Sequence, residues 1–420
     1  MALDEIRRIT EPAYYRFCII PRARRAHDKM VANLRKQGSA TIAFIVSSLP
    51  MWRFQLVYDR MKQDNRFHVH IVLFPFSSFT PEQRDSSIRQ LRNYFNSLGI
   101  PVTDLSNELL PGSALKSLIN PDIIFYPQPY NRTYQNDLDC SYFSDRLLCY
   151  IPYAMLTAKE NWAYKCHFNN IAWRLFFQST PRFEEAKKVL FNHGDNIRIT
   201  GEPVADLFQR PEVTKIWKPQ PYRKKRVIWA PHYSITHTEF LNRNSFIWLS
   251  EAMWNLAILY KEQLQFAFKP HPKLLSVLYE TEGWGREKAD SYYQKWAEGD
   301  NTQLETGNYI DLFKTSDAMI HDSSSFSVEY HYTGKPVMFT TINLVDAISN
   351  LNEFGRDAIL AHYHGSSSEQ VKSFIDNVVI AGNDPKKKER LDFFKNYLQT
   401  PGNTPVSENI YREIVNSIWG

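Results

Sequence analysis

The chain has 420 residues, of which 43% are hydrophobic and 23% are charged. This composition excludes a disordered or collagen-like chain, and at roughly 150 residues per domain the length predicts two to three domains. Lys and Arg total 50 against 45 Asp and Glu, a net charge of +5 that is not gathered into one long basic stripe, which argues against nucleic acid as a partner.

Cysteine use and hydropathy indicate the cell compartment. The four cysteines, Cys18, Cys140, Cys149 and Cys166, have neither C-x-x-C spacing nor the density of a disulfide scaffold. No apolar run approaches the roughly 20 residues that cross a bilayer, and the N-terminus lacks the apolar stretch of a signal peptide. We therefore expect a cytoplasmic protein, free in solution or peripheral on the inner face of the cell membrane.

Residues 1–38 form a basic leader that has two interpretations. Residues 21–36 carry six Lys and Arg against a single acid, Asp28, and they follow an aromatic and aliphatic stretch at 14–20. Such an order favours contact with an anionic membrane surface, where each basic side chain contributes about 1 kcal/mol. It is also typical of a solvated helix that packs on the first domain, which is the simpler interpretation.

From residue 40 onwards, short apolar runs alternate with helical patterns. The predicted strands lie at 41–46, 67–74, 122–125, 146–151, 175–178 and 197–200, and the predicted helices at 51–62, 81–97 and 181–192. Strands that alternate with helices of this length indicate βαβ units and a parallel sheet. The first half is therefore predicted to be a Rossmann-like domain.

The alternation of predicted strands and helices stops at Gly201-Glu202-Pro203. A proline-rich, basic stretch at 211–225 follows, which is typical of a linker. A second alternation then begins. Its predicted strands lie at 226–229, 264–268, 302–305, 318–321 and 337–340, with helices at 244–260, 273–298, 309–315 and 326–331, and three terminal helices at 368–379, 384–398 and 407–419. We predict an acceptor-side domain at 1–210, a linker at 211–225 and a nucleotide-donor domain at 226–420. Two Rossmann-like α/β domains that face a cleft, with a C-terminal helical tail, form the architecture of GT-B transferases.

Several familiar signatures are missing. The sequence contains no G-x-G-x-x-G after its first strand, no phosphate-binding G-x-x-x-x-G-K-[ST], no H-E-x-x-H and no G-x-S-x-G. Asp137 and Asp139 form a D-x-D, but they lie in a polar, turn-like stretch that is more typical of exposed loops. No metal and no cofactor are predicted.

One acid and three serines follow the predicted strand at 318–321. The run consists of Asp322, Ser323, Ser324 and Ser325. Free backbone N–H groups, hydroxyls and the positive end of a helix dipole converge at such a strand-to-helix turn, which favours phosphate binding. Glu329, one turn further on, is placed to reach a ribose hydroxyl. The alternative is a simple N-cap, which needs one such residue where this run has four.

Two other strand ends carry histidines. Lys269 and His271 belong to a Lys-Pro-His-Pro turn after the strand at 264–268, and the prolines restrict the backbone around them. An ammonium group and an imidazole there can neutralise charge on a pyrophosphate as its bond breaks. His232 and Tyr233, after the strand at 226–229, are placed to contact the base, the phosphates or the acceptor. The alternative for the Lys-Pro-His-Pro turn is a capped turn with an exposed histidine.

The order and spacing of these motifs resemble the CDP-glycerol glycerophosphotransferase family of teichoic-acid and capsule polymerases, which are GT-B enzymes. The resemblance rests on Lys-Pro-His-Pro at 269–272, Tyr309-x-Asp311-Leu312, Asp317, Asp322-x-Ser324, Glu329, Pro336, Phe339, Ala-Pro-His-Tyr at 230–233, and Gly201-Glu202-Pro203 with Asp206. It implies that the second half binds a CDP-alditol and that the serine and histidine motifs hold its pyrophosphate. The residues carried over are Lys269, His271, Ser323, Ser324, Ser325 and Glu329.

The first half departs from the family pattern. Family members commonly carry a Trp-His-Gly-Thr-Pro-like segment whose histidine is the proposed base, whereas residues 147–153 here read Leu-Leu-Cys-Tyr-Ile-Pro-Tyr. His167 and Tyr153 are the remaining candidates for the base.

We therefore predict a transferase that moves glycerol- or ribitol-phosphate from a CDP-alditol to a hydroxyl of a glycan or lipid-linked acceptor in teichoic acid, capsule or similar surface-glycan synthesis, with release of CMP. The missing histidine keeps open a glycosyltransferase of the same fold that uses a CMP-, UDP- or GDP-sugar. A third alternative, from another class, is a non-catalytic protein that binds nucleotide or glycan. The basic leader adds an anionic membrane surface as a further candidate partner.

Overall fold

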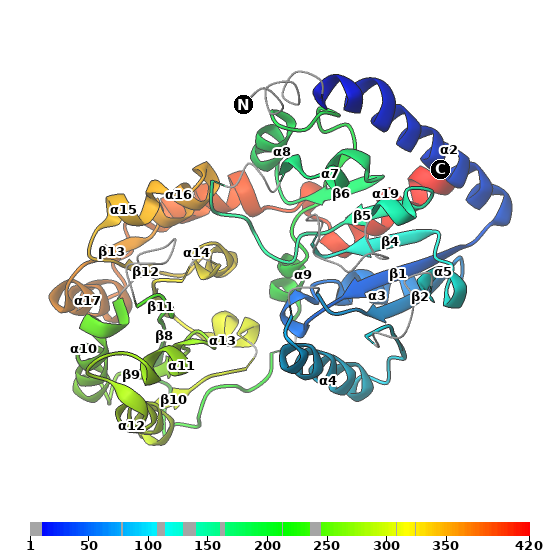
Figure 1. Ribbon diagram of the computed structural model, residues 1–420. Helices are drawn as coiled ribbons and strands as arrows, with labels where there is room; N and C mark the ends of the chain where they lie inside the picture. The colour runs from blue at the N-terminus through cyan, green and yellow to red at the C-terminus, as the bar shows by residue number, and fades with distance from the viewer. Residues whose placement is uncertain are drawn as a thin grey trace. The chain divides into compact units, whose positions relative to one another are not determined.

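The computed structural model describes residues 11–76, 79–106, 114–128, 140–159, 164–211, 213–235, 245–307, 309–323 and 325–420. The chain folds into two compact units (Figure 1). Unit 1 comprises residues up to Ala154, Glu160–Asp206 and Gln399–Gly420, and unit 2 comprises Met155–Lys159 and Leu207–Leu398.

Unit 1 is built on a sheet of seven parallel strands in the order β3-β2-β1-β4-β5-β6-β7. The strands are β1 (Ala40–Val46), β2 (Phe67–Leu73), β3 (Val102–Asp104), β4 (Ile123–Tyr126), β5 (Leu147–Tyr150), β6 (Arg174–Phe177) and β7 (Ile197–Ile199). The central strands are almost entirely buried, as parallel strands covered on both faces must be. The sheet grows from β1 to β3 on one side and from β4 to β7 on the other, so the order in which strands are added reverses between β1 and β4. This is the Rossmann topology, and the predicted class of the first domain is confirmed.

The helices of unit 1 are α2 (Ile20–Gln37), α3 (Gln55–Lys62), α4 (Pro81–Ser97), α5 (Ala114–Leu118), α7 (His167–Ile171), α8 (Thr180–Lys187) and α19 (Val406–Trp419), with a π-helical turn η1 (Tyr15–Ile19) before α2. Helix α4 begins as the sequence predicts, because Thr80 and Gln83 form a capping box around its first turn. Helix α9 (Val204–Gln209) carries the chain from unit 1 into unit 2.

Unit 2 repeats the topology with a sheet of six parallel strands in the order β10-β9-β8-β11-β12-β13. The strands are β8 (Lys225–Ala230), β9 (Leu264–Phe268), β10 (Thr302–Leu304), β11 (Ala318–His321), β12 (Val337–Thr340) and β13 (Tyr363–Gly365). The order in which strands are added to the sheet reverses between β8 and β11. Ligands of such sheets bind beyond the carboxyl ends of the strands at this switch point. The second Rossmann-like domain is thereby also confirmed.

The helices of unit 2 are α10 (Ser245–Leu259), α11 (Leu274–Tyr279), α12 (Gly285–Glu298), α13 (Ile310–Thr315), α14 (Phe326–Glu329), α15 (Leu344–Ser349), α16 (Glu353–Leu360), α17 (Ser368–Phe374) and α18 (Lys387–Phe393). The single helical region predicted at 273–298 is two helices, because Gly283 and Gly285 adopt left-handed φ angles of 76° and 69° between them. Helices α17 and α18 each continue as a π-helical turn, η5 (Ile375–Ile380) and η6 (Phe394–Leu398).

The units differ from the predicted division at 1–210, 211–225 and 226–420. The terminal helix α19 belongs to unit 1, where Asp206 accepts hydrogen bonds from the backbone N–H groups of Val406 (2.7 Å) and Ser407 (2.8 Å). The Oε1 atom of Glu413 in α19 accepts hydrogen bonds from the Nε atoms of Arg174 (2.7 Å) and Arg198 (2.8 Å). These contacts join residues about 200 positions apart, which local patterns cannot predict.

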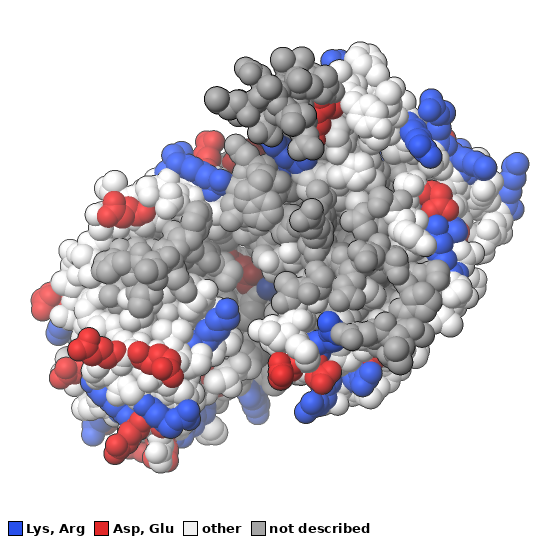
Figure 2. Space-filling view, in the orientation of Figure 1, with Lys and Arg blue, Asp and Glu red and all other residues white. Residues whose placement is uncertain are grey.

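Helix α2 packs on unit 1 and exposes a basic face. Its residues Ile20, His27 and Leu34 are buried, and Trp419 of α19 donates its indole N–H to the carbonyl of Leu34 (3.2 Å). Lys and Arg side chains line the outer side of this helix (Figure 2). Residues 20–37 of the leader therefore form a helix that packs on the first domain. In the described part of the chain, no helix combines the length and the apolar character that crossing a bilayer needs.

Candidate functional site

The predicted histidine turns lie next to each other at the switch point of unit 2. The backbone N–H of Lys269 donates to the carbonyl of Trp229 (2.8 Å), and the N–H of His271 donates to the carbonyl of Pro231 (3.0 Å). The alternating prolines 270 and 272 have no N–H, so the turn uses its available donors to extend the pairing of β8 and β9 past their ends. The structure thus brings together the turns that follow two neighbouring strands.

Three rings meet there. The ring centroids of His232 and His271 are 5.0 Å apart, and Tyr233 lies 4.4 Å from His232 and 4.5 Å from His271. The Nζ atom of Lys273 stands 5.3 Å from the centre of the Tyr233 ring. Aromatic surface, imidazoles and an ammonium group therefore share one small region at the carboxyl edge of the sheet.

A common hydrogen bond fixes the tautomer of three histidines at this edge. In each, Nδ1 accepts from the backbone N–H two residues later: Ser234 for His232 (3.3 Å), Lys273 for His271 (3.1 Å) and Ser323 for His321 (3.1 Å). A backbone N–H can only donate, so the neutral rings must carry their proton on Nε2. For His271, which is half-buried, the hydrogen-bond donor of the neutral ring is thereby Nε2–H.

The electrostatics of the Lys-Pro-His-Pro turn favour an anion. Burial lowers the pKa of Lys269, which is only 6% exposed, and the nearby carboxylate of Glu305 acts in the opposite direction. Burial, Lys273 and Lys269 together lower the pKa of His271 to about 4. His271 is thus neutral at pH 7, and the positive charge comes from the lysines rather than from the imidazole. An anionic ligand would raise both pKa values by stabilising the charged forms.

Asp322 positions this edge, a role that the sequence did not indicate. Its buried carboxylate accepts from the backbone N–H of His232 (2.5 Å) and from the N–H (3.3 Å) and hydroxyl of Ser245, at the start of α10. Asp322 follows β11, so it ties together the ends of β8 and β11 and the first turn of α10. Glu305, after β10, is a second carboxylate that sequence analysis did not find.

The serine run differs from its prediction. Ser323 is buried and its N–H is used by His321, whereas Ser325 is exposed and its side chain caps no helix N–H. Helix α14 has only 4 residues and passes at Tyr330 into a 3₁₀ turn, so the predicted helix at 326–331 is too long and its dipole weaker than expected. Glu329 lies in α14 and is 4% exposed. Ser324, like Asp137 and Asp139, lies outside the described residues.

The two base candidates lie in unit 1. His167 is the first residue of α7, and its Nδ1 is 2.7 Å from the hydroxyl of Tyr15. Tyr153 is half-buried against the hydrophobic cluster of unit 1. Their assignment as a base stays a prediction. Among the described residues, no three His, Cys, Asp or Glu side chains are grouped as a metal ion requires.

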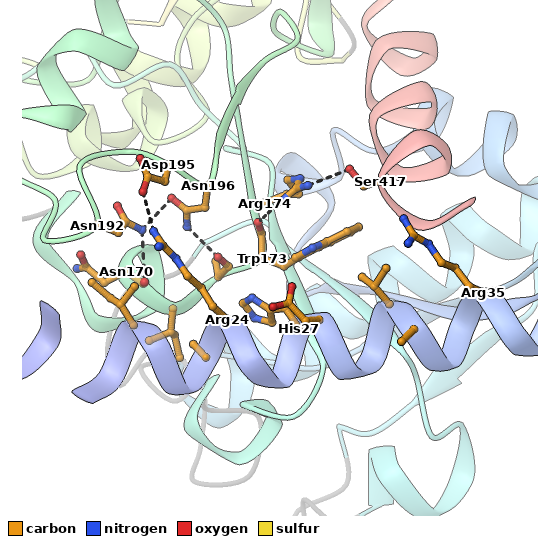
Figure 3. Close-up of a pocket in the computed structure, with 17 residues that line it drawn as sticks. Arg24, His27, Arg35, Asn170, Trp173, Arg174, Asn192, Asp195, Asn196 and Ser417 are labelled. Atoms are coloured by element: carbon orange, nitrogen blue, oxygen red, sulfur yellow. Dashed lines mark hydrogen bonds and ion pairs between the residues drawn. The ribbon is translucent and has the colours of Figure 1, made fainter. Parts of the chain in front are cut away.

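A cavity of about 520 Å³ lies between α2 and the amino ends of the unit 1 strands, but its polar groups bind one another (Figure 3). Arg24 pairs with Asp195 (2.6 Å), and Arg174 donates to Glu413 (2.7 Å) and Ser417 (2.9 Å). Burial and Arg174 lower the pKa of His27 to about 4, so this histidine is uncharged at pH 7. The cavity is therefore the place where α2 docks, and its chemistry does not resemble that of the histidine turns.

Comparison with known proteins identifies a family and structures of similar fold. A family model described as CDP-Glycerol:Poly(glycerophosphate) glycerophosphotransferase matches residues 158–416, more than half of the chain. No curated protein matches. A variant of the wall teichoic acid polymerase TagF has a similar structure, with a TM-score of 0.58 and 9% identity over 100% of this chain and 99% of that one.

Two nucleotide-sugar enzymes are also similar in structure. MnaA from S. aureus, solved with UDP, has a TM-score of 0.56 and 14% identity over 90% of this chain and 96% of its own. A UDP-GlcNAc 2-epimerase from Neisseria meningitidis, bound to UDP-GlcNAc, has a TM-score of 0.54 and 12% identity over 90% of this chain and 100% of its own. At these identities the likeness establishes the fold, the GT-B class of two Rossmann-like domains. The chain belongs to the CDP-glycerol:poly(glycerophosphate) glycerophosphotransferase family.

Proposed function

We propose that the carboxyl edge of the unit 2 sheet binds a CDP-alditol and positions it for transfer of glycerol- or ribitol-phosphate. The observation that carries this proposal is the cluster of His232, Tyr233 and His271 beside the buried Lys269 at the switch point. Lys269 supplies positive charge to the pyrophosphate, and the Nε2–H of His271 donates a hydrogen bond to it. Ser323 and Ser325 are the proposed further contacts to the phosphates, and the sequence adds Ser324 to them.

The nucleoside occupies the opposite side of this cluster in the proposed complex. Tyr233 and His232 are the proposed contacts to the nucleoside, and the hydrogen bonds of His232 with Ser234 and Asp322 fix the orientation of its ring and backbone. Glu329 is the proposed acceptor for a ribose hydroxyl. Because it is 4% exposed, that contact requires neighbouring side chains to move when the donor binds.

The proposed reaction is a displacement at the β-phosphorus. The acceptor hydroxyl oxygen forms a bond to this phosphorus while the bond to the bridging oxygen breaks, and CMP leaves with the electron pair. The hydroxyl proton passes to a base, for which Tyr153 and His167 of unit 1 are the candidates. The protein contributes orientation and stabilisation of the charge that develops on the phosphates. The product is an alditol-phosphate diester on a surface-glycan acceptor.

Donor binding can be tested by thermal shift. CDP-glycerol or CDP-ribitol at 100 times its Kd should stabilise the native state by about 2.7 kcal/mol, because a ligand that binds only the native state raises the unfolding free energy. Lys269→Met, which keeps the length of the side chain, should lose most of this stabilisation. Lys288→Met is the matched control, because Lys288 is exposed on α12, where it donates to the carbonyl of Gly283 (2.7 Å) and lies 4.8 Å from the centre of the Trp284 ring.

Product analysis then separates the alternatives. CMP release with alditol phosphate on the acceptor supports the proposal. Stabilisation by a CMP-, UDP- or GDP-sugar, with sugar transferred, would establish a glycosyltransferase instead. Binding of CDP-alditol with no CMP released in the presence of glycan acceptors would identify a non-catalytic binding protein.

The outer face of α2 supports a second proposal, that the protein rests on an anionic membrane surface. Phe17 is 74% exposed and Tyr14 is 58% exposed just before this helix. At 100° per residue, Arg22, Arg25, Lys29 and Lys36 lie within roughly 60° of one another, opposite the buried face. All four basic side chains are exposed. An apolar entry followed by a basic face is the pattern of helices that lie in the membrane interface.

A double charge reversal tests this second proposal. Arg25→Glu/Lys29→Glu should weaken binding to phosphatidylserine-containing vesicles at least 10-fold, because each basic residue near such a surface contributes about 1 kcal/mol. The measurement is co-sedimentation with vesicles, compared with vesicles of phosphatidylcholine alone. Lys387→Glu/Lys395→Glu makes the same change of charge at exposed positions of unit 2 and should bind as the wild type. Equal binding by both double variants would rule out α2 as the contact.

A further inference from the structure

A second cavity of unit 2 lies at the amino edge of its sheet, away from the histidine turns. It has a volume of about 780 Å³ and is lined by residues 213–224 together with Arg226, Gln265 and Thr315. We call it the basic pocket. The lining residues between 213 and 226 precede β8 or lie at its start, whereas His232 follows β8. A strand of six residues spans roughly 20 Å. The basic pocket is therefore separate from the proposed donor site.

The lining carries five cations and no acid. They are Lys215, Lys218, Lys224, Arg223 and Arg226. None of them forms an ion pair within the described part of the chain.

The partners of these cations are neutral. Lys218 donates to the carbonyl of Gly299 (2.8 Å), and Lys224 donates to that of Lys261 (2.5 Å). The guanidinium of Arg226 lies 5.3 Å from the centre of the Trp217 ring. Carbonyl and ring partners orient a cation without cancelling its charge, so the pocket keeps its positive potential.

Asp311, Asp317 and Glu262 lie near the pocket but outside its lining, and they offset only part of the charge of its five cations. Asp311 and Asp317 accept hydrogen bonds from backbone N–H groups, those of Thr214 (3.1 Å) and Arg226 (2.8 Å), and Glu262 accepts the hydroxyl of Tyr222. Burial lowers the pKa of Lys335 to about 8, while Asp317 raises it and Arg223 adds a smaller lowering.

The pocket is held open by its own wall, although its sequence is typical of a linker. Trp217 is 7% exposed and donates its indole N–H to the hydroxyl of Thr315 (2.9 Å). The backbone N–H of Lys218 donates to Gln303 (2.7 Å), and its carbonyl accepts from Gln265 (2.7 Å). Because these anchors fix the middle of the segment, a ligand meets an ordered surface and loses less free energy to the ordering of the loop.

The shape and chemistry of the basic pocket select among anionic ligands. Its cations come from the whole segment from Lys215 to Arg226, and two of them reach different elements, Lys218 the carbonyl of Gly299 and Lys224 that of Lys261. A set of charges distributed in this way suits a chain of phosphates better than a single one. Arg226 lies over the ring of Trp217, and the Nζ atom of Lys224 lies 5.2 Å from the centre of the Tyr222 ring, so a cation already occupies a face of each ring on which a nucleic acid base could stack. A flat membrane does not enter a concave site.

We infer that the basic pocket binds a phosphodiester polyanion, namely the poly(alditol phosphate) chain that the proposed reaction extends. This identity of the polymer rests on the proposed function. The pocket holds the chain at a distance from the donor site, so a long acceptor is retained between transfers by two contacts. Retention of this kind raises the effective concentration of the acceptor without changing the chemical step.

The test replaces the two cations that have no hydrogen-bond partner among the described residues. Lys215→Glu/Arg223→Glu should raise the Kd for a synthetic oligo(glycerol phosphate) at least 10-fold, measured by calorimetry without any donor, and should weaken its dependence on salt. The KM for this oligomer should rise similarly, while kcat with a single-unit glycerol phosphate acceptor stays unchanged. Lys387→Glu/Lys395→Glu, with the same change of net charge in unit 2, should behave as the wild type.

The outcomes distinguish this inference from the proposed function. An unchanged Kd for the oligomer in Lys215→Glu/Arg223→Glu would overturn the inference, whatever the activity. Equal losses for the oligomer, single-stranded RNA and phosphatidylserine vesicles would also overturn it, because the pocket would then be a nonspecific basic surface. Selective loss of oligomer binding supports it even if CMP is released from no donor. In that case only the proposed transfer would fail.

Discussion

Replacement of His271 by alanine is expected to lower the kcat of CDP-alditol turnover by about 10²-fold or more, the usual cost of one preorganised donor to a developing anion. The ring is held by its backbone N–H bond to Pro231 and by the N–H of Lys273 on Nδ1, so Nε2–H has a fixed direction. Alanine removes this donor and leaves the backbone contact. The fold should therefore survive while the transition state loses stabilisation.

The matched control for this experiment is His364→Ala. His364 is also a half-buried histidine of unit 2, but it lies on the edge strand β13 and bonds the carbonyl of Ile359 (2.9 Å). The kcat of the His364→Ala variant should stay within a few-fold of the wild-type value. The kcat/KM of the wild type should show no loss from His271 between about pH 5.5 and 8, because its free-enzyme pKa is about 4. Near-normal turnover by His271→Ala would remove the imidazole from the mechanism.

Replacement of Asp322 by alanine is expected to lower the free energy of unfolding of unit 2 by about 3 kcal/mol or more. The substitution leaves the backbone N–H of His232 and both donors of Ser245 without their buried acceptor. The measurement is urea unfolding, followed by tryptophan fluorescence. Donor affinity should fall as well, because the turn that carries His232 loses its anchor.

Two further variants bracket this effect. Asp322→Asn keeps one oxygen acceptor and should lose less stability than Asp322→Ala. Asp300→Ala removes an exposed carboxylate of the same unit and should change the unfolding free energy by no more than about 0.5 kcal/mol. Stability equal to that of the wild type in Asp322→Ala would mean that water replaces the carboxylate at no cost, and Asp322 would lose its positioning role.

The sequence predicted those parts of the fold that depend on local apolar runs. Strands β9, β11 and β12 lie where their apolar runs placed them, because buried parallel strands are apolar throughout. The edge strands β3 and β13 escaped prediction, since each has only three residues and their sequences, Val-Thr-Asp and Tyr-His-Gly, carry no such run. These two strands are recognisable only from their pairing with β2 and β12.

The sequence likewise predicted those residues of the candidate site that a local pattern marks. Lys269, His271 and His232 were found because each follows a strand whose end the sequence marks. Asp322 was seen as part of a serine run, but its partner Ser245 lies 77 residues away, and no local pattern indicates the contact. The length of α14 was overestimated because helical periodicity continues past Glu329, whereas the last turn tightens and Gly334 ends it with φ 66°.

The return of α19 to unit 1 imposes an order on biosynthesis. The strands of unit 1 leave the ribosome before roughly 200 residues of unit 2, and at about 5–20 residues per second the helix that covers them follows on the order of tens of seconds later. Until then, the surface that receives Val406, Ile410, Ile414 and Ile418 is open to water or to chaperones. The half of the molecule that is synthesised first must therefore be completed last, and a nascent chain stalled before residue 399 would display that apolar surface.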